Sequence, residues 1–150
     1  MTVSGDPPLT GLRVLDLTQF LSGPYCTQML ADLGAQIIKV ESPQGDLSRN
    51  IPPNFVGNDS LYYISVNRNK QSVAVDMKIP AGVEIVRQLI LASDVVVENF
   101  RPGVLERLGL KESELRSEQP RLIWCSISGF GQSGPYRDKP AYDMIVQALS

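Results

Sequence analysis

Side chains suited to a phosphate-bearing ligand gather after one short apolar segment. Asn99 ends the segment DVVVEN, Phe100 and Arg101 follow it, and Arg107 comes two helical turns later. An amide, an aromatic ring and two guanidinium groups could bind phosphates, because guanidinium forms bidentate, charge-assisted hydrogen bonds. The same residues could also form an ordinary solvated loop. The residues alone leave both interpretations open.

Other charged side chains flank the predicted strands. Arg68, Lys70 and Lys78 surround the segment QSVAVD and could also bind phosphates or simply face solvent. Asp16 and Glu98 each lie at a strand end, but no spacing identifies them as an acid/base pair. These residues therefore define no reaction.

The glycine-rich segment GFGQSG, residues 129–134, has the G-x-G-x-x-G spacing of dinucleotide-binding loops. In such loops a helix follows the glycines and its free amides bind the pyrophosphate. Here Pro135 and Pro140 follow, with charged residues between them, so no helix continues from the turn. We predict a flexible glycine-rich loop at the carboxyl end of a strand, where ligands of open α/β sheets bind.

The composition excludes several classes of function. The chain of 150 residues contains no histidine, which removes Ser-His-Asp and Cys-His catalysis and the commonest zinc ligand. A net charge of -2 leaves no basic face for nucleic acid, so we expect a small-molecule partner. Cys26 and Cys125 are predicted to be small buried residues, and we predict no metal site.

The N-terminal residues have neither a basic start nor an apolar signal core, and no apolar run approaches the ~20 residues that span a bilayer. We therefore expect a cytoplasmic protein that does not bind membranes.

Apolar segments and turn residues predict alternating strands and helices. In the first helix Ser22 is the expected N-cap and Gly34 the stop, and the apolar face is expected to contain Cys26, Met29, Leu30 and Leu33. Residues 60–66 could be helix or strand, and residues 42–58 are expected to form a long surface loop. The predicted strands are 12–17, 36–41, 71–76, 94–99 and 121–128, and the predicted helices begin at residues 22, 80, 102 and 112.

This alternation predicts the α/β class: an open, mostly parallel sheet with helices on both faces, about one domain in size. The first strand, helix and second strand should form a β-α-β unit with a right-handed crossover.

Five segments together resemble the N-terminal part of a class III CoA-transferase, the CaiB/BaiF or formyl-CoA transferase-like family. They are GLRVLDLTQFLSGPYCTQMLADLGAQIIKVESPQGD, SLYYISVNRNKQSVAVDMK, DVVVENFRPGVLERLGL, PRLIWCSISGFGQSGP and PAYDMIVQALS. The resemblance implies that residues 11–150 are the N-terminal portion of a Rossmann-like, CoA-binding large domain, preceded by a flexible N-terminus, residues 1–10.

The resemblance also implies a reaction. In such enzymes an aspartate attacks an acyl-CoA thioester, becomes an aspartyl-CoA thioester and passes CoA to a second carboxylic acid, with no tightly bound cofactor. The nucleophilic aspartate is expected after Ser150, so the chain by itself is expected to be inactive.

The resemblance places CoA contacts on residues from four parts of the chain. Many family members have Arg where this chain has Ser42, so a contact at that position is in doubt. The implied CoA-contacting residues are Leu21, Ser22, Val75 to Lys78, Asn99, Phe100, Arg101, Arg107, Tyr142 and Asp143.

Two alternatives remain open. The family also contains α-methylacyl-CoA racemases, which have a histidine base where this chain has Tyr142, and a phenol with a pKa of ~10 is a poor base at neutral pH. The chain could also be a non-catalytic CoA-binding fragment. The resemblance further implies an interlocked homodimer for the full-length enzyme, and we expect the short chain alone to associate through exposed apolar surface.

Overall fold

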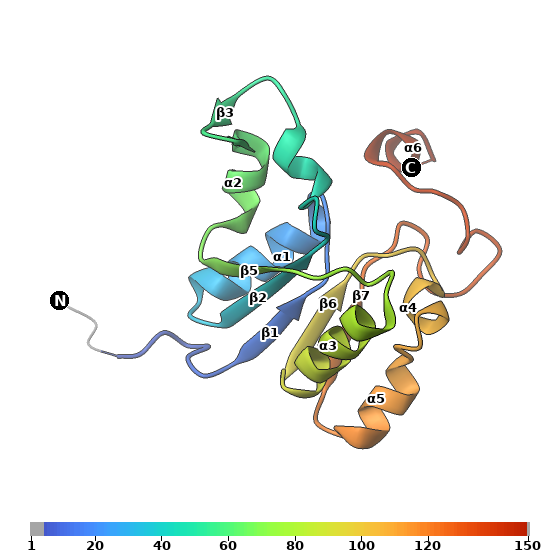
Figure 1. Cartoon of the computed structure of the whole chain (residues 1–150). Coiled ribbons are helices and arrows are strands. Elements are labelled where there is room, and N and C mark those ends of the chain that lie inside the picture. Colours follow the sequence, from blue (N-terminus) through green and yellow to red (C-terminus); the bar gives the residue numbers. More distant parts are fainter. Residues whose placement is uncertain (1–4, 150) are drawn as a thin grey trace.

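Five parallel strands form a single sheet at the centre of the computed structural model, which describes residues 5–149 (Figure 1). The strand order is β5-β2-β1-β6-β7, and every neighbouring pair is parallel. This confirms the predicted fold class. The strands are β1 (Arg13–Asp16), β2 (Gln36–Glu41), β5 (Lys70–Ala74), β6 (Val95–Glu98) and β7 (Ile123–Ser126).

Helices connect the strands, as the alternating pattern predicted. They are α1 (Ser22–Asp32), α2 (Leu61–Asn67), α3 (Pro80–Leu91), α4 (Val104–Arg107), α5 (Glu112–Glu118) and α6 (Asp143–Leu149). Smaller elements lie between β2 and α2: the 3-10 helix η1 (Leu47–Asn50) and the antiparallel strands β3 (Phe55–Val56) and β4 (Asp59–Ser60).

Alternate residues of the central strands enter two hydrophobic cores, one on each face of the sheet, as the period of two along a strand requires. Leu15 and Val96 belong to the larger core, which α3, α4 and α5 cover, whereas Val14 and Val97 belong to the smaller core beside α1. The helices therefore cover both faces of the sheet (Figure 1).

Helix α1 differs from its prediction in two ways. Ser22 is the first helical residue and not the N-cap, which is Leu21 and makes no side-chain capping bond. The expected apolar face is only partly confirmed: Leu30 packs against the smaller core and Cys26 is half-buried, but Met29 and Leu33 are 45% and 47% exposed. The helix instead buries a more polar face: Gly23, Pro24, Thr27, Gln28 and Ala31.

The physical reason for the second error is a buried carboxylate. The Thr27 hydroxyl donates a hydrogen bond of 2.5 Å to Asp16, at the end of β1. A polar residue with such a partner can be buried at little cost, and an apolar pattern does not reveal it. The two cysteines are likewise half-buried and not fully buried as predicted.

The segment 42–58 is only partly a surface loop. It contains η1 and β3, and both Asp46 and Ser48 are buried, with Ser48 donating from its amide and its hydroxyl to Asp46. Residues 61–67, whose secondary structure the sequence left open, form α2 with the Ser60 hydroxyl as its cap.

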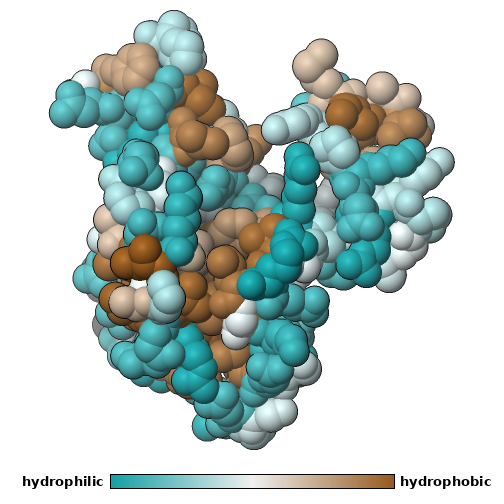
Figure 2. All heavy atoms as spheres, turned by 45° about the vertical axis from the view of Figure 1, so that its right-hand side comes forward, coloured by the Kyte–Doolittle hydropathy of each residue, from teal (hydrophilic) through white to brown (hydrophobic). Residues whose placement is uncertain are grey.

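The glycine-rich segment leads into an irregular stretch, and the next helix, α6, begins only at Asp143. At Gly129 a Cβ atom would lie 1.8 Å from the Cβ of Ala141, so the returning chain requires glycine there. Gly131 and Gly134 adopt positive φ angles of 79° and 91°. Backbone geometry thus explains these glycines without a dinucleotide, as predicted. Figure 2 shows a hollow between the part of the molecule that carries α2 and the part that carries α6.

Candidate functional site

The candidate site lies where the strand order reverses, between β1 and β6. After β1 the chain adds strands β2 and β5 toward one edge of the sheet, and after β6 it adds β7 toward the other edge. The connections that follow β1 and β6 therefore lead in opposite directions. A crevice at the carboxyl ends of such strands is the usual ligand site of an open α/β sheet. The turn after β1 leads to Leu21 and Ser22, and the turn after β6 contains Asn99, Phe100 and Arg101.

Asn99 joins these two turns directly. Its side-chain oxygen accepts a hydrogen bond of 2.9 Å from the Gln19 amide, and its side-chain nitrogen donates one of 2.8 Å to the Gln19 carbonyl. Both polar groups of the side chain therefore act within the fold. Asn99 positions the turn that precedes Leu21, a role that the sequence did not indicate.

A buried lysine holds the same turn from the other side. Lys39, on β2, is fully buried; its ammonium group donates a 2.6 Å hydrogen bond to the Thr18 carbonyl and lies 3.0 Å from the Asp46 carboxylate. The Thr18 amide and hydroxyl both donate to Asp16. Lys39 therefore links the β1–α1 turn to the start of η1.

Asp16 is the centre of a second buried ion pair. Its carboxylate lies 3.0 Å from the Lys70 ammonium group, and both side chains are at most 2% exposed. Burial opposes ionisation of Asp16, but Lys39, Lys70 and the two threonine hydroxyls together hold its pKa below the usual range. Lys70 is thus a structural partner of Asp16 and is not available to a phosphate.

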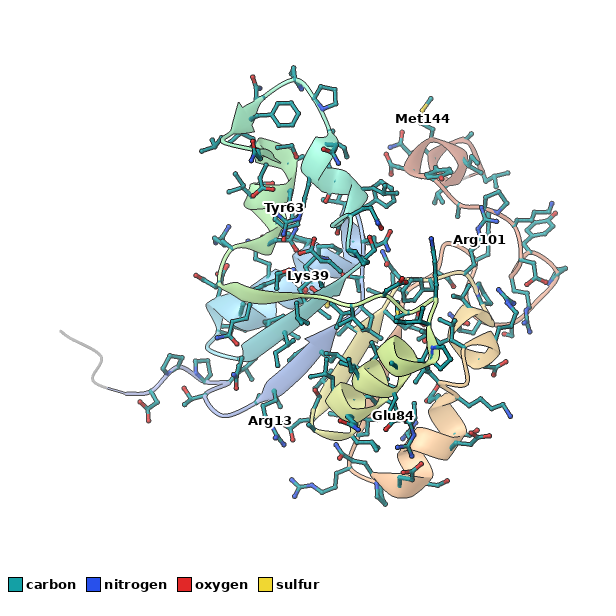
Figure 3. All side chains as sticks on the ribbon, in the orientation of Figure 1. Arg13, Lys39, Tyr63, Glu84, Arg101 and Met144 are labelled. Atoms are coloured by element: carbon teal, nitrogen blue, oxygen red, sulfur yellow. The ribbon has the colours of Figure 1, made fainter. Side chains whose placement is uncertain are left out.

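A third charged cluster lies at the carboxyl end of β2. Arg49 donates to both oxygens of Glu41 at 2.7 Å, and Glu41 also accepts from Tyr63 and Ser72. Burial tends to raise the pKa of Glu41, but these hydrogen bonds lower it to about 2. Figure 3 shows Lys39 and Tyr63 among the side chains gathered near the carboxyl ends of β1 and β2.

This cluster borders an open groove of about 310 Å³, lined by Glu41, Ser42, Arg49 and Ser72 among others. Ser42, the position where the resemblance left a CoA contact in doubt, therefore lies at the groove. Arg49 also lines the groove, but its guanidinium group already forms ion pairs with Glu41 and Asp59.

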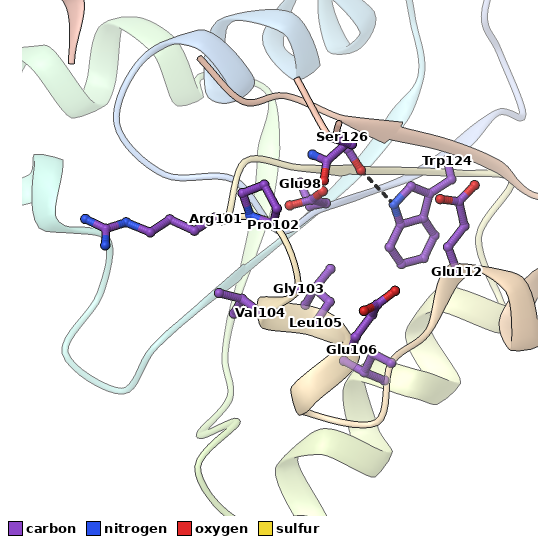
Figure 4. Close-up of a pocket in the computed structure, with 12 residues that line it drawn as sticks. Glu98, Arg101, Pro102, Gly103, Val104, Leu105, Glu106, Glu112, Trp124 and Ser126 are labelled. Atoms are coloured by element: carbon purple, nitrogen blue, oxygen red, sulfur yellow. Dashed lines mark hydrogen bonds between the residues drawn. The ribbon is translucent and has the colours of Figure 1, made fainter. Parts of the chain in front are cut away.

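A small cavity of about 80 Å³ lies beside the turn after β6 (Figure 4). Glu98 and Trp124 line it, and the Trp124 ring nitrogen donates to the Ser126 hydroxyl at 3.1 Å. Burial raises the pKa of Glu98, although its carboxylate accepts a hydrogen bond from the Phe100 amide. The Arg101 side chain points away from this cavity (Figure 4), and it is exposed.

The remaining predicted contacts lie in varied environments. Val75 is 6% exposed and belongs to the larger core, so its side chain packs in the core and only its backbone borders the edge of the sheet. Lys78 is exposed. The segment between them packs tightly on α3, since a Cβ at Gly82 would lie 1.9 Å from the Asp76 carbonyl oxygen.

Arg107, at the end of α4, is exposed and lies close to the turn after β6. A Cβ at Gly103 would be 3.2 Å from the Arg107 guanidinium group, so the glycine leaves room for it. Arg101 and Arg107 are thus two exposed cations, one before and one after Gly103 in the sequence.

Tyr142 and Asp143 lie at the start of α6, and Tyr142 is 66% exposed. No residue of α6 is buried among the residues described. Within this chain, then, few contacts fix the tyrosine in place, in contrast to the turns after β1 and β6.

Residues 5–149 contain no group of three or more histidine, cysteine, aspartate or glutamate side chains placed to hold a metal ion. None of the helices in that range has both the length and the hydropathy needed to cross a membrane.

Comparison with known proteins identifies a family. The sequence profile described as CoA-transferase family III matches residues 9–150. Human succinyl-CoA:glutarate CoA-transferase is 49% identical over 144 residues, which are 95% of this chain and 33% of the human protein. Acetyl-CoA:oxalate CoA-transferase of Acetobacter aceti is also 49% identical, over 95% of this chain and 37% of its own length.

Solved structures agree with the sequence comparison. A CAIB/BAIF family protein from Brucella suis superposes with a TM-score of 0.91 at 42% identity, covering 97% of this chain and 39% of the Brucella chain. The chain thus spans about a third of the length of the curated relatives it matches.

Proposed function

Because the chain belongs to CoA-transferase family III, we propose that it forms the CoA-binding part of an enzyme that transfers coenzyme A between carboxylic acids. The family match across residues 9–150 carries this proposal. The geometry supports it: Asn99 joins the turns that follow the neighbouring strands β1 and β6, and the exposed Arg101 and Arg107 lie in or near the turn after β6. A ligand with charged phosphates and an uncharged arm suits that arrangement.

In the proposed reaction a carboxylate of the enzyme attacks the thioester carbonyl of the donor acyl-CoA. A C–O bond forms, the C–S bond breaks, and the products are a mixed anhydride and the CoA thiolate. The thiolate then attacks the aspartyl carbonyl, which releases the donor acid and leaves an aspartyl-CoA thioester. The acceptor carboxylate then attacks the aspartyl-CoA thioester, which releases the CoA thiolate and forms a second mixed anhydride. The thiolate attacks the acceptor's acyl carbonyl in that anhydride, which gives the acceptor acyl-CoA and regenerates the aspartate without consuming water.

We propose that this aspartate follows Ser150 and that residues 5–149 contribute CoA contacts. Arg101 and Arg107 are the proposed phosphate ligands, because they are exposed and neighbour an ordered turn. The backbone near Leu21 and Ser22, and Tyr142 with Asp143, are proposed to lie toward the thioester.

The acids exchanged do not follow from overall similarity. Relatives named for succinyl-CoA with glutarate and for acetyl-CoA with oxalate are equally identical to this chain, at 49%. An assay should therefore offer each donor with each acceptor.

Calorimetric titration with CoA tests the binding part of the proposal. We expect stoichiometric binding by the chain, weakened about tenfold by Arg101→Ala, because a charge-assisted hydrogen bond to phosphate contributes about 1.5–3 kcal/mol. Arg121→Ala is the matched control: Arg121 is an exposed arginine just before β7, at the amino ends of the parallel strands and therefore opposite the proposed site, and its loss should not change the affinity. Equal effects of the two variants would contradict the proposed site.

A second assay tests the reaction. A polypeptide that continues past Ser150 should exchange CoA between two acids and form a covalent CoA adduct on an aspartate, detectable by mass spectrometry. Exchange of the α-proton of a branched acyl-CoA in deuterated water, without acid exchange, would favour the racemase instead. CoA binding with neither reaction would leave a non-catalytic CoA-binding fragment.

We further propose that the full-length enzyme is a homodimer and that the short chain associates. In support, α1 carries large exposed apolar side chains, among them Tyr25 at 51% and Met29 at 45% exposure. A monodisperse monomer of the 150-residue chain in sedimentation would contradict the expected association.

A further inference from the structure

Three neighbouring strands each end in a buried carboxyl group, and one of the three has no cation beside it. Asp16 ends β1 and pairs with Lys70. Glu41 ends β2 and pairs with Arg49. Glu98 ends β6 and is 6% exposed, like Glu41, but it forms no ion pair with any residue that the structure describes. A buried carboxylate without a counter-charge is costly, so Glu98 favours its neutral form.

Uncharged hydrogen-bond partners connect Glu98 to two other parts of the molecule. The Phe100 amide, in the turn after β6, donates to the Glu98 carboxyl group at 2.8 Å. The Ser126 hydroxyl, on β7, also bonds to this carboxyl group, and it accepts a hydrogen bond of 3.1 Å from the Trp124 ring nitrogen. A change in the charge of Glu98 therefore reaches the turn after β6 in one direction and the Trp124 ring in the other.

The charged groups around Glu98 add to the cost of ionising it. Glu106 of α4 and Glu112 of α5 line the same cavity of about 80 Å³, to which β7 contributes only uncharged side chains. Arg101 is the only cation among the described residues that line it, and its side chain points away (Figure 4). Burial, with a further contribution from Glu112, raises the pKa of Glu98 above its ordinary value of 4.5, and its hydrogen bonds offset this only in part.

We propose that Glu98 is a positioning residue linked to a proton: its neutral form holds the turn after β6 in the conformation that binds CoA, and binding draws a proton from solvent onto its carboxylate. This inference rests on the function proposed above. CoA brings several negative phosphate charges to this turn, and a buried negative charge immediately before the turn opposes them. If the neutral form binds CoA more tightly, CoA must favour the neutral form by the same factor.

The fluorescence of Trp124, the only tryptophan in the sequence, tests the ionisation of Glu98 without ligand. A pH titration should show a transition with its midpoint above pH 4.5. Glu98→Gln should abolish it, because glutamine keeps the acceptor for the Phe100 amide but cannot ionise. Ser126→Ala should move the midpoint to higher pH, since it removes a hydrogen bond that favours the carboxylate. The matched control Glu106→Gln removes an exposed carboxylate from the same cavity and should leave the transition in place.

Unfolding by urea distinguishes this role from a purely structural one. Because folding raises the pKa of Glu98, its contribution to stability is complete below pH 4.5 and is lost as the pH rises through the folded-state pKa. Glu98→Gln should therefore unfold at a higher urea concentration than the wild type above the fluorescence midpoint, and should lose that advantage below it.

Calorimetric titration with CoA on both sides of the fluorescence midpoint tests the linkage. Above the midpoint, Glu98→Gln should bind CoA about fivefold more tightly than the wild type, at the low end of usual couplings between sites. Below the midpoint, the two affinities should agree within about twofold. The same coupling should move the wild-type fluorescence midpoint upward by about 0.7 of a pH unit when CoA is bound.

Three results would overturn the inference: a fluorescence transition that persists in Glu98→Gln, equal CoA affinities of this variant and the wild type above the midpoint, or lower stability of the variant there. Absence of CoA binding by the wild-type chain at every pH would refute the proposed function and the linkage together. A missing transition in a wild-type chain that binds CoA would refute the inference alone.

Discussion

The carboxyl ends of β1 and β2 and the segment after β7 are organised in opposite ways. At the first, the charged residues Asp16, Lys39 and Glu41 are at most 6% exposed and hold the neighbouring turns through ion pairs and hydrogen bonds. In the second, residues 131–149 are almost all exposed, and α6 buries no residue. Both regions carry residues of the proposed CoA site.

The difference shows which part of the proposed site this chain organises by itself. A buried charge costs several kcal/mol unless it is paired, so the positions of its partners are strongly determined. The exposed helix α6 buries no residue, so no buried charge determines where its partners must lie. We therefore expect ligand groups near Gln19 and Asn99 to meet a preformed surface, and Tyr142 to be fixed by contacts made after ligand binding or with other chain segments.

The largest expected effect comes from breaking the Lys39–Asp46 pair. Lys39→Met should destabilise the chain by about 3–5 kcal/mol, because the buried Asp46 carboxylate loses its counter-charge. Urea unfolding measures the loss. The control Lys111→Met removes an exposed, solvent-screened pair with Glu114 and should cost far less stability. Similar losses in both variants would show that the buried cluster has no special role.

The second-largest effect is expected at low pH, which should reduce the folding stability that the same region provides. The folded-state pKa of Glu41 is about 2 against an ordinary value of 4.5, so its contribution to stability is complete above pH 4.5 and is lost as the pH falls toward 2. The shift corresponds to about 3 kcal/mol, with little screening because the Glu41 side chain is 3% exposed.

Urea unfolding at several pH values between 7 and 2.5 measures this loss (expected total ~3 kcal/mol). Glu41→Gln should be less stable at neutral pH and should lose less stability on acidification. An unchanged pH slope in that variant would show that other carboxylates dominate the acid response.

The smallest effect is expected in the exposed segment. Met144 is 82% exposed, so Met144→Ala should change the free energy of unfolding by less than about 0.5 kcal/mol. The buried Ile90, truncated in the same way, should cost about 2–5 kcal/mol. A large loss at Met144 would mean that α6 packs against a surface in solution, and the contrast between the two regions would then disappear.

Much of the fold could be predicted because local patterns were consistent. The β-branched runs around Val14, Ile37 and Val96 gave strands within two residues of their observed ends, and Pro80 marked the start of α3. The α1 face was only partly predicted, because Thr27 is buried through its hydrogen bond to Asp16, and hydropathy patterns are insensitive to such bonds.

The candidate site was predicted less completely. The turn after β6 was identified from its residue types, but Asn99 binds the backbone of Gln19, 80 positions earlier, and Lys70 pairs with Asp16, 54 positions earlier. Such partners depend on which strands become neighbours, which no local spacing reveals.

The sequence by itself determined the α/β alternation, the absence of histidine chemistry, and the end of the glycine-rich turn without a helix, because each depends on residue type and near neighbours. Only the tertiary structure decided that Lys39 and Lys70 are internal counter-ions, that Val75 is a core residue, and that the Asn99 side chain binds the backbone of Gln19. The reason is physical: a charge, an amide or a ring acquires its role from the partner the fold brings to it, and here those partners come from strands distant in the chain.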